Sequence, residues 1–357
     1  MNPPASPQSL FTGTQPVAPA HAFNEARLAD WLQTHVPGFE GPLQVAQFRG
    51  GQSNPTSLLS AGGRRYVLRR KPMGELLPSA HAVDREFRVI RALAGSAVPV
   101  AHAHALCEDP SVIGSAFYVM DHVEGRIFWD PTLPGMNPAE RGAIYDELNR
   151  VLAALHQVNP AAVGLADYGR PGAYLERQVA RWSRQYKAAE TEPIEAADRL
   201  NEWLPRHMPP EGETRIVHGD YRLDNVIFHP TEPRVLAVLD WELSTLGDPL
   251  VDFAYHCLSW RMPPGSRGLA GINTAALGIP GEAHHLARYL LRTGRTQPVP
   301  PRDWNYYLVF NMFRLVGILQ GIAKRAQQGN ASNATAVETG KRARPLAEQA
   351  WALAQSL

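Results

Sequence analysis

The feature of this chain that most constrains its fold is a pair of short apolar stretches, each followed by an acidic residue. Residues 216–217 lead into Asp220 through a glycine-containing turn, and residues 235–239 lead into Asp240; Asn225 lies between them. This layout fits a phosphoryl-transfer site. One carboxylate orients the attacking hydroxyl, while the amide and the second carboxylate hold Mg²⁺ on the nucleotide phosphates.

Each of these polar residues also has a plain structural interpretation. Asp220 could only cap a turn, Asn225 could be a turn residue, and Asp240 could be the N-cap of a helix that begins at Trp241. Because all three structural interpretations would have to hold at once, we favour a phosphoryl-transfer site formed by these residues. We interpret His218 as a structural imidazole that hydrogen-bonds the loop backbone rather than as an acid or base.

Length and charge limit the class of protein. With 357 residues, 44% of them hydrophobic, the chain can fill a two-lobed enzyme with a substantial core. Its 35 basic and 34 acidic residues nearly cancel, so no large field would attract nucleic acid or an anionic membrane. The cysteines Cys107 and Cys257 have no metal-type spacing and suit small buried side chains in a reducing compartment.

The N-terminal segment and the most apolar run do not predict a membrane anchor. Residues 1–22 lack the basic and apolar regions of a signal peptide and are expected to form a flexible tail. The run 306–322 contains Asn311, Arg314 and Gln320, which would be costly in lipid, so we expect a core helix. We therefore expect a cytoplasmic protein without membrane or nucleic-acid partners.

The hydrophobic patterning predicts an α+β protein with a β-rich half followed by a helical half. Strands are expected at 43–48, 56–60, 65–70, 117–120, 216–217 and 235–239. Helices are expected near 28–32, at 84–93, 144–156, 174–186 and 195–204, and through most of 249–357. The expected plan is the tail 1–22, a nucleotide-binding N-lobe 23–120, a hinge 121–126, and a C-lobe 127–357 with the catalytic loop and the acceptor site.

A phosphoryl-transfer site also needs an adenine pocket and a cation for the phosphates, and the strand 65–70 offers both. Val67 and Arg69 are two positions apart and share a strand face, where Val67 could line the pocket and Arg69 could reach the phosphates. An ion pair from Glu86 would fix the direction of that cation, although Glu86 could instead belong to a solvated helix face. Lys71 lies on the same strand face and is the alternative phosphate contact.

A glycine-containing loop precedes this strand. Gly50, Gly51, Ser53 and Asn54 lie between two expected strands and could offer backbone N–H groups and small side chains to phosphate. The loop lacks the G-x-G-x-x-G spacing, and many hairpins carry such turns, so an ordinary turn is the alternative.

With these motifs the chain resembles the aminoglycoside phosphotransferase and choline-kinase-like family, relatives of the protein kinases. The resemblance covers roughly residues 25–330 and implies a protein-kinase-like fold, with a small antiparallel sheet in the N-lobe and a mainly helical C-lobe. It is carried by His218, Gly219, Asp220, Asn225, residues 239–241, residues 247–249, Asp252, Val67, Arg69, Glu86 and the hinge-like run 117–125.

The resemblance implies ATP and Mg²⁺ as cofactors, with GTP as an open alternative to ATP, and a role for each matched residue. Asp220 would be the catalytic base or would position the hydroxyl, and Asn225 and Asp240 would bind Mg²⁺. Arg69 would be the phosphate cation and Glu86 its partner. The strand cation departs from the wider kinase pattern, because arginine replaces lysine and its planar fork has a different geometry.

The remaining implied roles concern adenine and the catalytic loop. Met120 would line the adenine pocket, while backbone groups of Asp121 and Val123 would read the adenine edge. Asp252 would be the buried carboxylate that braces the catalytic loop.

The acceptor is the least constrained part of the prediction. Kinases of polycationic aminoglycosides tend to surround the acceptor with carboxylates, whereas this helical half offers Arg177, Arg181, Arg184 and the run 289–295, which could also be solvated helix faces. Among the kinases, the chain is most similar to kinase domains fused to, or encoded beside, acyl-CoA dehydrogenases. The runs that carry this similarity are 50–56, 66–72, 77–86 and 174–182.

That similarity implies phosphorylation of hydroxyacyl-CoA esters, 4-hydroxyacyl-CoA in particular, and a functional coupling to an acyl-CoA dehydrogenase. The alternatives are an aminoglycoside, choline or sugar kinase, a nucleotide-binding module without transfer activity, and a metal-dependent phosphohydrolase. The last of these would not need an adenine pocket or a hinge.

Overall fold

The computed structural model describes residues 12–49, 54–72, 82–328 and 336–357. The chain divides into two compact units, each assembled from distant segments. Unit 1 comprises Met1–Ala166, Arg222–Ser244 and Asn273–Pro280, and unit 2 comprises Asp167–Tyr221, Thr245–Ile272 and Gly281–Leu357. The lobe boundary expected at residues 121–126 stays a prediction, and each unit is described by itself.

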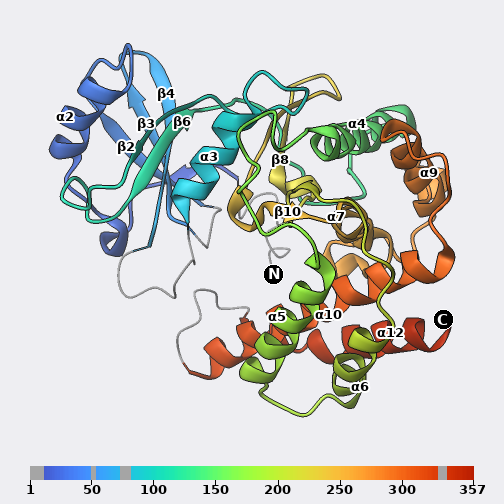
Figure 1. Ribbon diagram of the computed structural model, residues 1–357. Helices are drawn as coiled ribbons and strands as arrows, with labels where there is room; N and C mark the ends of the chain where they lie inside the picture. Colours follow the sequence, from blue (N-terminus) through green and yellow to red (C-terminus); the bar gives the residue numbers. More distant parts are fainter. Residues whose placement is uncertain (1–11, 50–53, 73–81, 329–335) are drawn as a thin grey trace, which may run out of the picture. The chain divides into compact units, whose positions relative to one another are not determined.

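Unit 1 contains a six-stranded antiparallel sheet with the strand order β1-β2-β3-β4-β6-β5. Its strands are β1 (Thr14–Gln15), β2 (Gln44–Phe48), β3 (Thr56–Ala61), β4 (Arg64–Arg70), β5 (Ala103–Cys107) and β6 (Phe117–Asp121). Figure 1 shows β2, β3, β4 and β6 side by side in blue to green, with the helix α2 (Glu25–His35) beside them. The sheet and the helical elements confirm the predicted α+β class.

Two strands of this sheet were not predicted. β1 lies in the segment expected to be a flexible tail, and its pairing of Thr14 with Phe48 orders that part of residues 1–22. β5 has the sequence Ala-His-Ala-Leu-Cys, which lacks the β-branched and aromatic residues that mark a strand. It forms because β6 offers it a free edge.

The two faces of the sheet have different partners. Leu68 and Val119 share one face because they are directly paired across β4 and β6. They belong to an apolar cluster with Leu28 and Leu32 of α2, all fully buried. The opposite face carries Arg69, which is paired with Tyr118. This opposite face is the one on which the predicted nucleotide residues lie.

The rest of unit 1 is built around helices and a small hairpin. The main helices are α3 (Val83–Leu93), α4 (Pro138–Gln157) and α8 (Thr274–Leu277), with 3₁₀ turns at Pro19–His21, Leu223–Asn225 and Trp241–Leu243. α4 begins with a capping box, in which Asn137 and Glu140 satisfy each other's backbone N–H groups. β8 (Val226–Phe228) and β9 (Val235–Val238) form an antiparallel hairpin.

Unit 2 is mainly helical. Its helices are α5 (Tyr174–Ala189), α6 (Glu195–Trp203), α7 (Pro249–Cys257), α9 (Glu282–Arg292), α10 (Pro301–Gln327), α11 (Ala336–Gly340) and α12 (Ala343–Gln355), with 3₁₀ turns at Leu204–Arg206, Leu258–Trp260 and Pro264–Ser266. A two-stranded ribbon of β7 (Arg215–Val217) and β10 (Thr245–Gly247) completes it. β7 thus pairs with β10, while β9 pairs with β8.

α10 is the core helix of unit 2. By length and composition it could cross a membrane, but 67% of its most apolar window is buried against neighbouring elements. Two of its polar residues make hydrogen bonds inside the unit: Asn311 Nδ2 donates to Val251 O at 2.9 Å, and Gln320 Oε1 accepts from Thr191 N at 3.0 Å. Hydrogen bonds of this kind are usual for polar side chains in a protein interior.

Candidate active site

The hairpin of β8 and β9 brings the two predicted metal ligands to one end. Val226 is paired with Val238, so Asn225 before β8 and Asp240 after β9 lie at the same end of the hairpin. The N–H of Leu239 donates to Asn225 O at 2.8 Å and extends the pairing by one residue. Asn225 and Asp240 are therefore close together along the backbone at this end of the hairpin.

Asp240 has a left-handed backbone, with φ 63° and ψ 60°. For a non-glycine residue this conformation costs free energy, and such strained residues are often found at functional sites. Asp240 occupies the N-cap position of the 3₁₀ turn at Trp241–Leu243, but its side chain caps no N–H group of that turn. The interpretation of Asp240 as a simple helix cap is therefore wrong.

The side chain of Asp240 instead forms an ion pair with Arg69 Nη2. Arg69 Nε lies 2.8 Å from Glu86 Oε2, which is the predicted ion pair between strand and helix. Burial by itself would lower the pKa of Arg69, but the carboxylates of Glu86 and Asp240 raise it above its ordinary value. The guanidinium is thus held by one carboxylate from α3 and one from the β9 end.

Glu86 is buried, so it does not belong to a solvated helix face. Besides Arg69, it accepts hydrogen bonds from Asn54 Nδ2 at 2.8 Å and Tyr118 Oη at 3.2 Å. Burial raises the pKa of Glu86, and Arg69 and these donors oppose the rise. Asn54, predicted as a phosphate contact, has its amide on Glu86. The other loop residues predicted for phosphate, Gly50, Gly51 and Ser53, lie outside the described residues.

Lys71 was the alternative to Arg69. Its Nζ lies 3.6 Å from Asp84 Oδ1, and its side chain is one-third exposed, at 33%. Arg69, in contrast, is the cation joined to both Glu86 and Asp240.

The residues predicted for the adenine pocket also share the Arg69 face of the sheet. Val67 is directly paired with Met120, and both are buried. The N–H of Asp121 donates to His102 O at 2.9 Å, and the Asp121 carboxylate contacts His104 Nε2 at 2.7 Å. The N–H of Asp121 is thus engaged within unit 1, and the predicted adenine contact of the Asp121 backbone would have to use its carbonyl. The N–H of Val123 donates to no backbone carbonyl in the described part of the chain.

In unit 2, the loop that carries Asp220 is held by a buried carboxylate. Asp252 on α7 accepts the N–H of His218 and the N–H of Gly219, each at 2.8 Å. Gly219 has φ 83°, a left-handed conformation that favours glycine. The predicted bracing contact of Asp252 is present.

The side chain of Asp220 is fixed from α7 as well. Tyr255 Oη donates to Asp220 Oδ1, and the N–H of Asp220 donates to His218 Nδ1 at 3.2 Å. Because His218 Nδ1 accepts this bond and the ring is fully buried, His218 is a structural imidazole, as predicted.

Three contact residues were missed from the sequence. Tyr118 binds Glu86, and Tyr255 binds Asp220. Arg314 on α10 donates from Nη2 to Gly219 O at 2.6 Å. The only available signal was the spacing of Tyr255, one helical turn after Asp252, which puts both side chains on one face of α7. Arg314 gave no signal, since its partner is 95 residues away in the sequence.

The predicted site residues thus form one cluster within each unit. Arg69, Glu86 and Asp240 meet in unit 1, where Asn225 also lies, whereas Asp220 and Asp252 meet in unit 2. The assigned roles of these residues in nucleotide binding and catalysis stay predictions.

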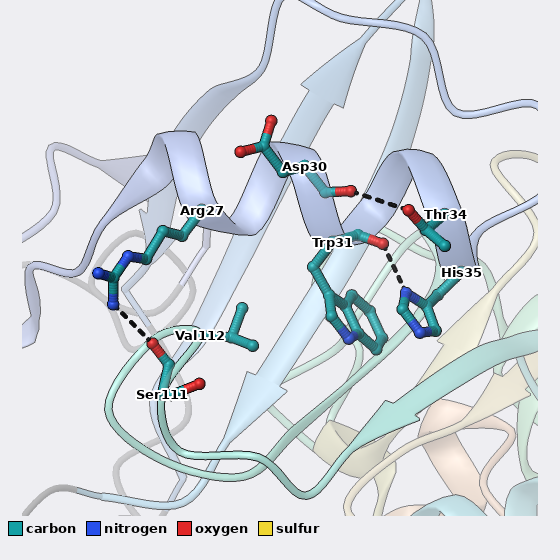
Figure 2. Close-up of a pocket in the computed structure, with 7 residues that line it drawn as sticks. All are labelled: Arg27, Asp30, Trp31, Thr34, His35, Ser111 and Val112. Carbon is teal, nitrogen blue, oxygen red and sulfur yellow. Dashed lines mark hydrogen bonds between the residues drawn. The ribbon is translucent and has the colours of Figure 1, made fainter.

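A depression on the surface of unit 1 is unrelated to these clusters. It is lined by Arg27, Asp30, Trp31, Thr34, His35, Ser111 and Val112, as Figure 2 shows. Its polar groups bond one another: Arg27 Nη1 donates to Ser111 O at 3.0 Å, and His35 Nδ1 lies 2.8 Å from Trp31 O. None of the predicted site residues lines it.

Comparison with known proteins identifies the family of this chain. The model of the phosphotransferase enzyme family matches residues 44–289. The mouse protein named acyl-CoA dehydrogenase family member 10 is 47% identical over 346 residues, covering 95% of this chain. The chain spans only 32% of that relative's length.

Solved structures show the same relationship. A candidate aminoglycoside phosphotransferase from Ralstonia eutropha JMP134 is 58% identical, with a TM-score of 0.85 and coverage of 94% of this chain and 99% of that one. A thermostable mutant of aminoglycoside phosphotransferase APH(4)-Ia, in a ternary complex with ADP and hygromycin B, shares the fold with a TM-score of 0.59 at 15% identity, covering 92% and 97% of the two chains. Together with the family match, these similarities show that the chain belongs to the phosphotransferase enzyme family.

Proposed function

We propose that this phosphotransferase moves the γ-phosphoryl group of ATP to the hydroxyl of a hydroxyacyl-CoA ester, with Mg²⁺ as the metal. The observation that carries the proposal is the pairing of Arg69 with both Glu86 and Asp240, because it joins the predicted phosphate cation to a predicted metal ligand. The related fold of APH(4)-Ia holds ADP and hygromycin B, which supports nucleotide binding here.

In this proposal the buried cluster of unit 1 handles the nucleotide. Arg69 is held in one direction by Glu86, so it contacts phosphate oxygens without losing side-chain entropy at that moment. Val67 and Met120, paired across β4 and β6, line the apolar site for the base. The carbonyl of Asp121 and the N–H of Val123 read the adenine edge.

The donors of Asn225 and Asp240 fit a hard cation, because both offer oxygen. In the described part of the chain, no group of three or more His, Cys, Asp or Glu side chains could hold a metal alone. That fits Mg²⁺, which takes one or two protein ligands and completes its shell with phosphate oxygens and water. When bound, the ion would neutralise charge on the transferring phosphoryl group.

Asp220 acts on the acceptor. Its carboxylate orients the hydroxyl and accepts the proton as the oxygen attacks phosphorus. Asp252 holds the N–H groups of the two residues that precede Asp220, and Tyr255 donates to one carboxylate oxygen of Asp220.

The choice of acceptor rests on two observations. The mouse relative carries an acyl-CoA dehydrogenase name, and exposed arginines of α5 suit an anionic acceptor better than a polycation. We extend the proposal to a functional coupling with an acyl-CoA dehydrogenase and to a location in the cytoplasm. An aminoglycoside acceptor is the second candidate, favoured by the description of the Ralstonia structure.

An acceptor panel tests the proposal. The protein is incubated with γ-labelled ATP, Mg²⁺ and, separately, 4-hydroxyacyl-CoA, choline, a sugar and an aminoglycoside, with Asp220→Asn as the inactive control. We expect label on the hydroxyacyl-CoA and none with the control variant. Label on the aminoglycoside alone would replace the acceptor, and no label on any acceptor would favour a module without transfer activity.

A further inference from the structure

Arg314 is a buried cation that has no carboxylate partner among the residues described by the structure. It is 7% exposed, and it donates one hydrogen bond, from Nη2 to Gly219 O. The guanidinium lies over two aromatic rings, 4.6 Å from the centroid of Tyr255 and 5.3 Å from that of Trp182. Its Nε has no hydrogen-bond partner within the described ranges, and no ion pair is formed there. Burying a charge this way is costly unless something compensates it.

A second arginine, Arg181, also contacts the ring of Trp182. The guanidinium of Arg181 on α5 is 5.6 Å from the centroid of that ring, and its side chain is exposed. Although part of the side chain reaches solvent, partial desolvation of the guanidinium and the neighbouring charge of Arg314 lower the pKa of Arg181. The two cations therefore repel each other, and Arg181 forms no ion pair with the residues that the structure describes.

A phenol completes the cluster: Tyr174 lies two helical turns before Arg181, on the same face of α5. Burial raises the pKa of Tyr174, and both Arg314 and Arg181 are near enough to oppose the rise. Tyr174 therefore stays protonated and is a hydrogen-bond donor at neutral pH.

The carboxylates that face this phenol, Asp252 and Asp248, are already engaged. Asp252 accepts the two N–H groups of the catalytic loop, and Asp248 Oδ1 accepts Leu250 N at 2.8 Å as the N-cap of α7. Asp220, the remaining carboxylate near Tyr255, is bound by that tyrosine. The cluster thus has an excess of donors.

We propose that Arg314, Arg181 and Tyr174 form an anion subsite for the acceptor, next to the catalytic loop. An oxyanion there would neutralise the two cations and accept charge-assisted hydrogen bonds from their guanidinium groups. The position follows from Arg314, which bonds the residue preceding Asp220 and stacks on the ring that fixes Asp220. The inference rests on the proposed function for the identity of the acceptor: the oxyanion is a phosphate of a CoA ester or the carboxylate of a free hydroxy acid.

Arg181 is the residue to change, because it is exposed and holds no part of the catalytic loop. Arg181→Gln removes the charge, and Arg181→Lys keeps it. The matched control is Arg199→Gln on α6 of the same unit, which also lies over a tryptophan, 5.8 Å from the ring of Trp351, but has its own acid, Glu195.

Two measurements are made on the full chain. Calorimetry follows the binding of CoA itself while the nucleotide site is saturated with AMP-PNP and Mg²⁺. Steady-state kinetics give KM and kcat for 4-hydroxyacyl-CoA, for the free 4-hydroxy acid and for an uncharged sugar. We expect Arg181→Gln to weaken CoA binding and to raise the KM of the anionic acceptor by about tenfold, the usual effect of one charge-assisted bond. In Arg181→Gln, the kcat and the KM for ATP should stay within about twofold of the wild-type values. Arg181→Lys should lose less affinity for CoA than Arg181→Gln does. Arg199→Gln should match the wild type in CoA affinity and in the KM of the anionic acceptor.

The outcomes separate the subsite from the proposed function. Unchanged CoA binding and KM in Arg181→Gln, or an equal loss with the uncharged sugar, would overturn the subsite while leaving the kinase assignment in place. Loss of CoA binding in a protein that never turns over CoA esters would support the subsite and reject the proposed acceptor. A charge-dependent KM with the free acid alone would assign the oxyanion to a carboxylate. Wild-type protein that binds neither CoA nor the free acid would overturn the subsite.

Discussion

The acidic cluster of unit 1 and that of unit 2 hold their carboxylates in opposite ways. In unit 1, Glu86 and Asp240 are held by a charge, the guanidinium of Arg69. In unit 2, Asp252 and Asp220 are held by neutral donors, namely two backbone N–H groups and a phenol. The difference matches the proposed tasks: a guanidinium lies in the cluster proposed to bind the triphosphate, whereas the proposed base Asp220 is contacted by a neutral phenol.

The largest effect should come from Asp220→Asn, which keeps the shape of the side chain but removes the base. Turnover should fall by about 10³-fold, the range of general base catalysis, while ATP binding stays close to that of the wild type. Turnover is measured with γ-labelled ATP and binding by calorimetry. If the variant turned over at the wild-type rate, Asp220 of unit 2 would not take part in the chemical step.

Asp240→Ala should act on the nucleotide instead. We expect the affinity for Mg²⁺-ATP to fall by about ten- to 100-fold, since one oxygen donor and the second partner of Arg69 are lost. Calorimetry with and without the metal separates the two causes. If the variant bound the nucleotide normally in both conditions, Asp240 would have no part in nucleotide binding.

Glu86→Gln tests the energetics of the buried ion pair. We expect the free energy of unfolding to fall by about 2–3 kcal/mol, less than for a fully stranded charge because Arg69 keeps Asp240. The matched control is Glu124→Gln, whose ion pair with Arg65 is exposed, with side chains 71% and 46% accessible. That change should cost less than about 1 kcal/mol in urea unfolding. Equal losses would show that burial of the Arg69 pair adds nothing.

Unit 2 should be the acid-sensitive region. Burial lowers the pKa of His256 to about 4, and its Nε2 lies 3.0 Å from Nε2 of His285. Because the unfolded histidine takes up a proton below pH 6.5 and the folded one does not, the stabilising contribution is complete above pH 6.5 and is lost as pH falls towards 4.

Between pH 7.5 and pH 5, His256 should therefore account for about 2 kcal/mol of lost stability. Urea unfolding at both pH values measures it, with His256→Gln as the comparison, since that variant should show a flatter dependence. Asp248 acts with the opposite sign, because burial raises its pKa to about 6, but it is present in both proteins. Identical pH slopes would mean that His256 is not a source of acid sensitivity.

Tyr255→Phe should have the smallest effect. It removes the hydroxyl that fixes Asp220 and keeps the ring on which Arg314 lies. We expect kcat to fall by about tenfold with the KM for ATP unchanged, as for the loss of one hydrogen bond to a charged group. A changed KM for ATP would contradict the assignment of nucleotide binding to unit 1 alone.

The sequence predicted most of the first cluster and half of the second. Strand periodicity put Val67 and Arg69 on one face, and the helix after them supplied Glu86, because these contacts depend on local geometry. Arg314 was read only as a polar interruption of an apolar helix. Its contact with Gly219 depends on how α10 packs in unit 2, which no local pattern records.

The strands show the same limit. β5 was missed because its residues are not strand formers, and it exists only through its pairing with β6. The strands β7 and β9 were predicted from apolar composition, but their partners β10 and β8 were not. Asn54 was predicted to face phosphate, whereas its amide is on Glu86, a contact set by the fold of the sheet against α3.

The most direct test of the central claim is to identify the phosphorus-containing products of the wild-type reaction. ³¹P NMR is recorded on the protein with ATP, Mg²⁺ and 4-hydroxyacyl-CoA, alongside the Asp220→Asn variant. We predict that a phosphate monoester resonance grows in step with ADP, and that the variant produces neither. Formation of ADP with inorganic phosphate and no monoester would contradict transfer to the acceptor hydroxyl.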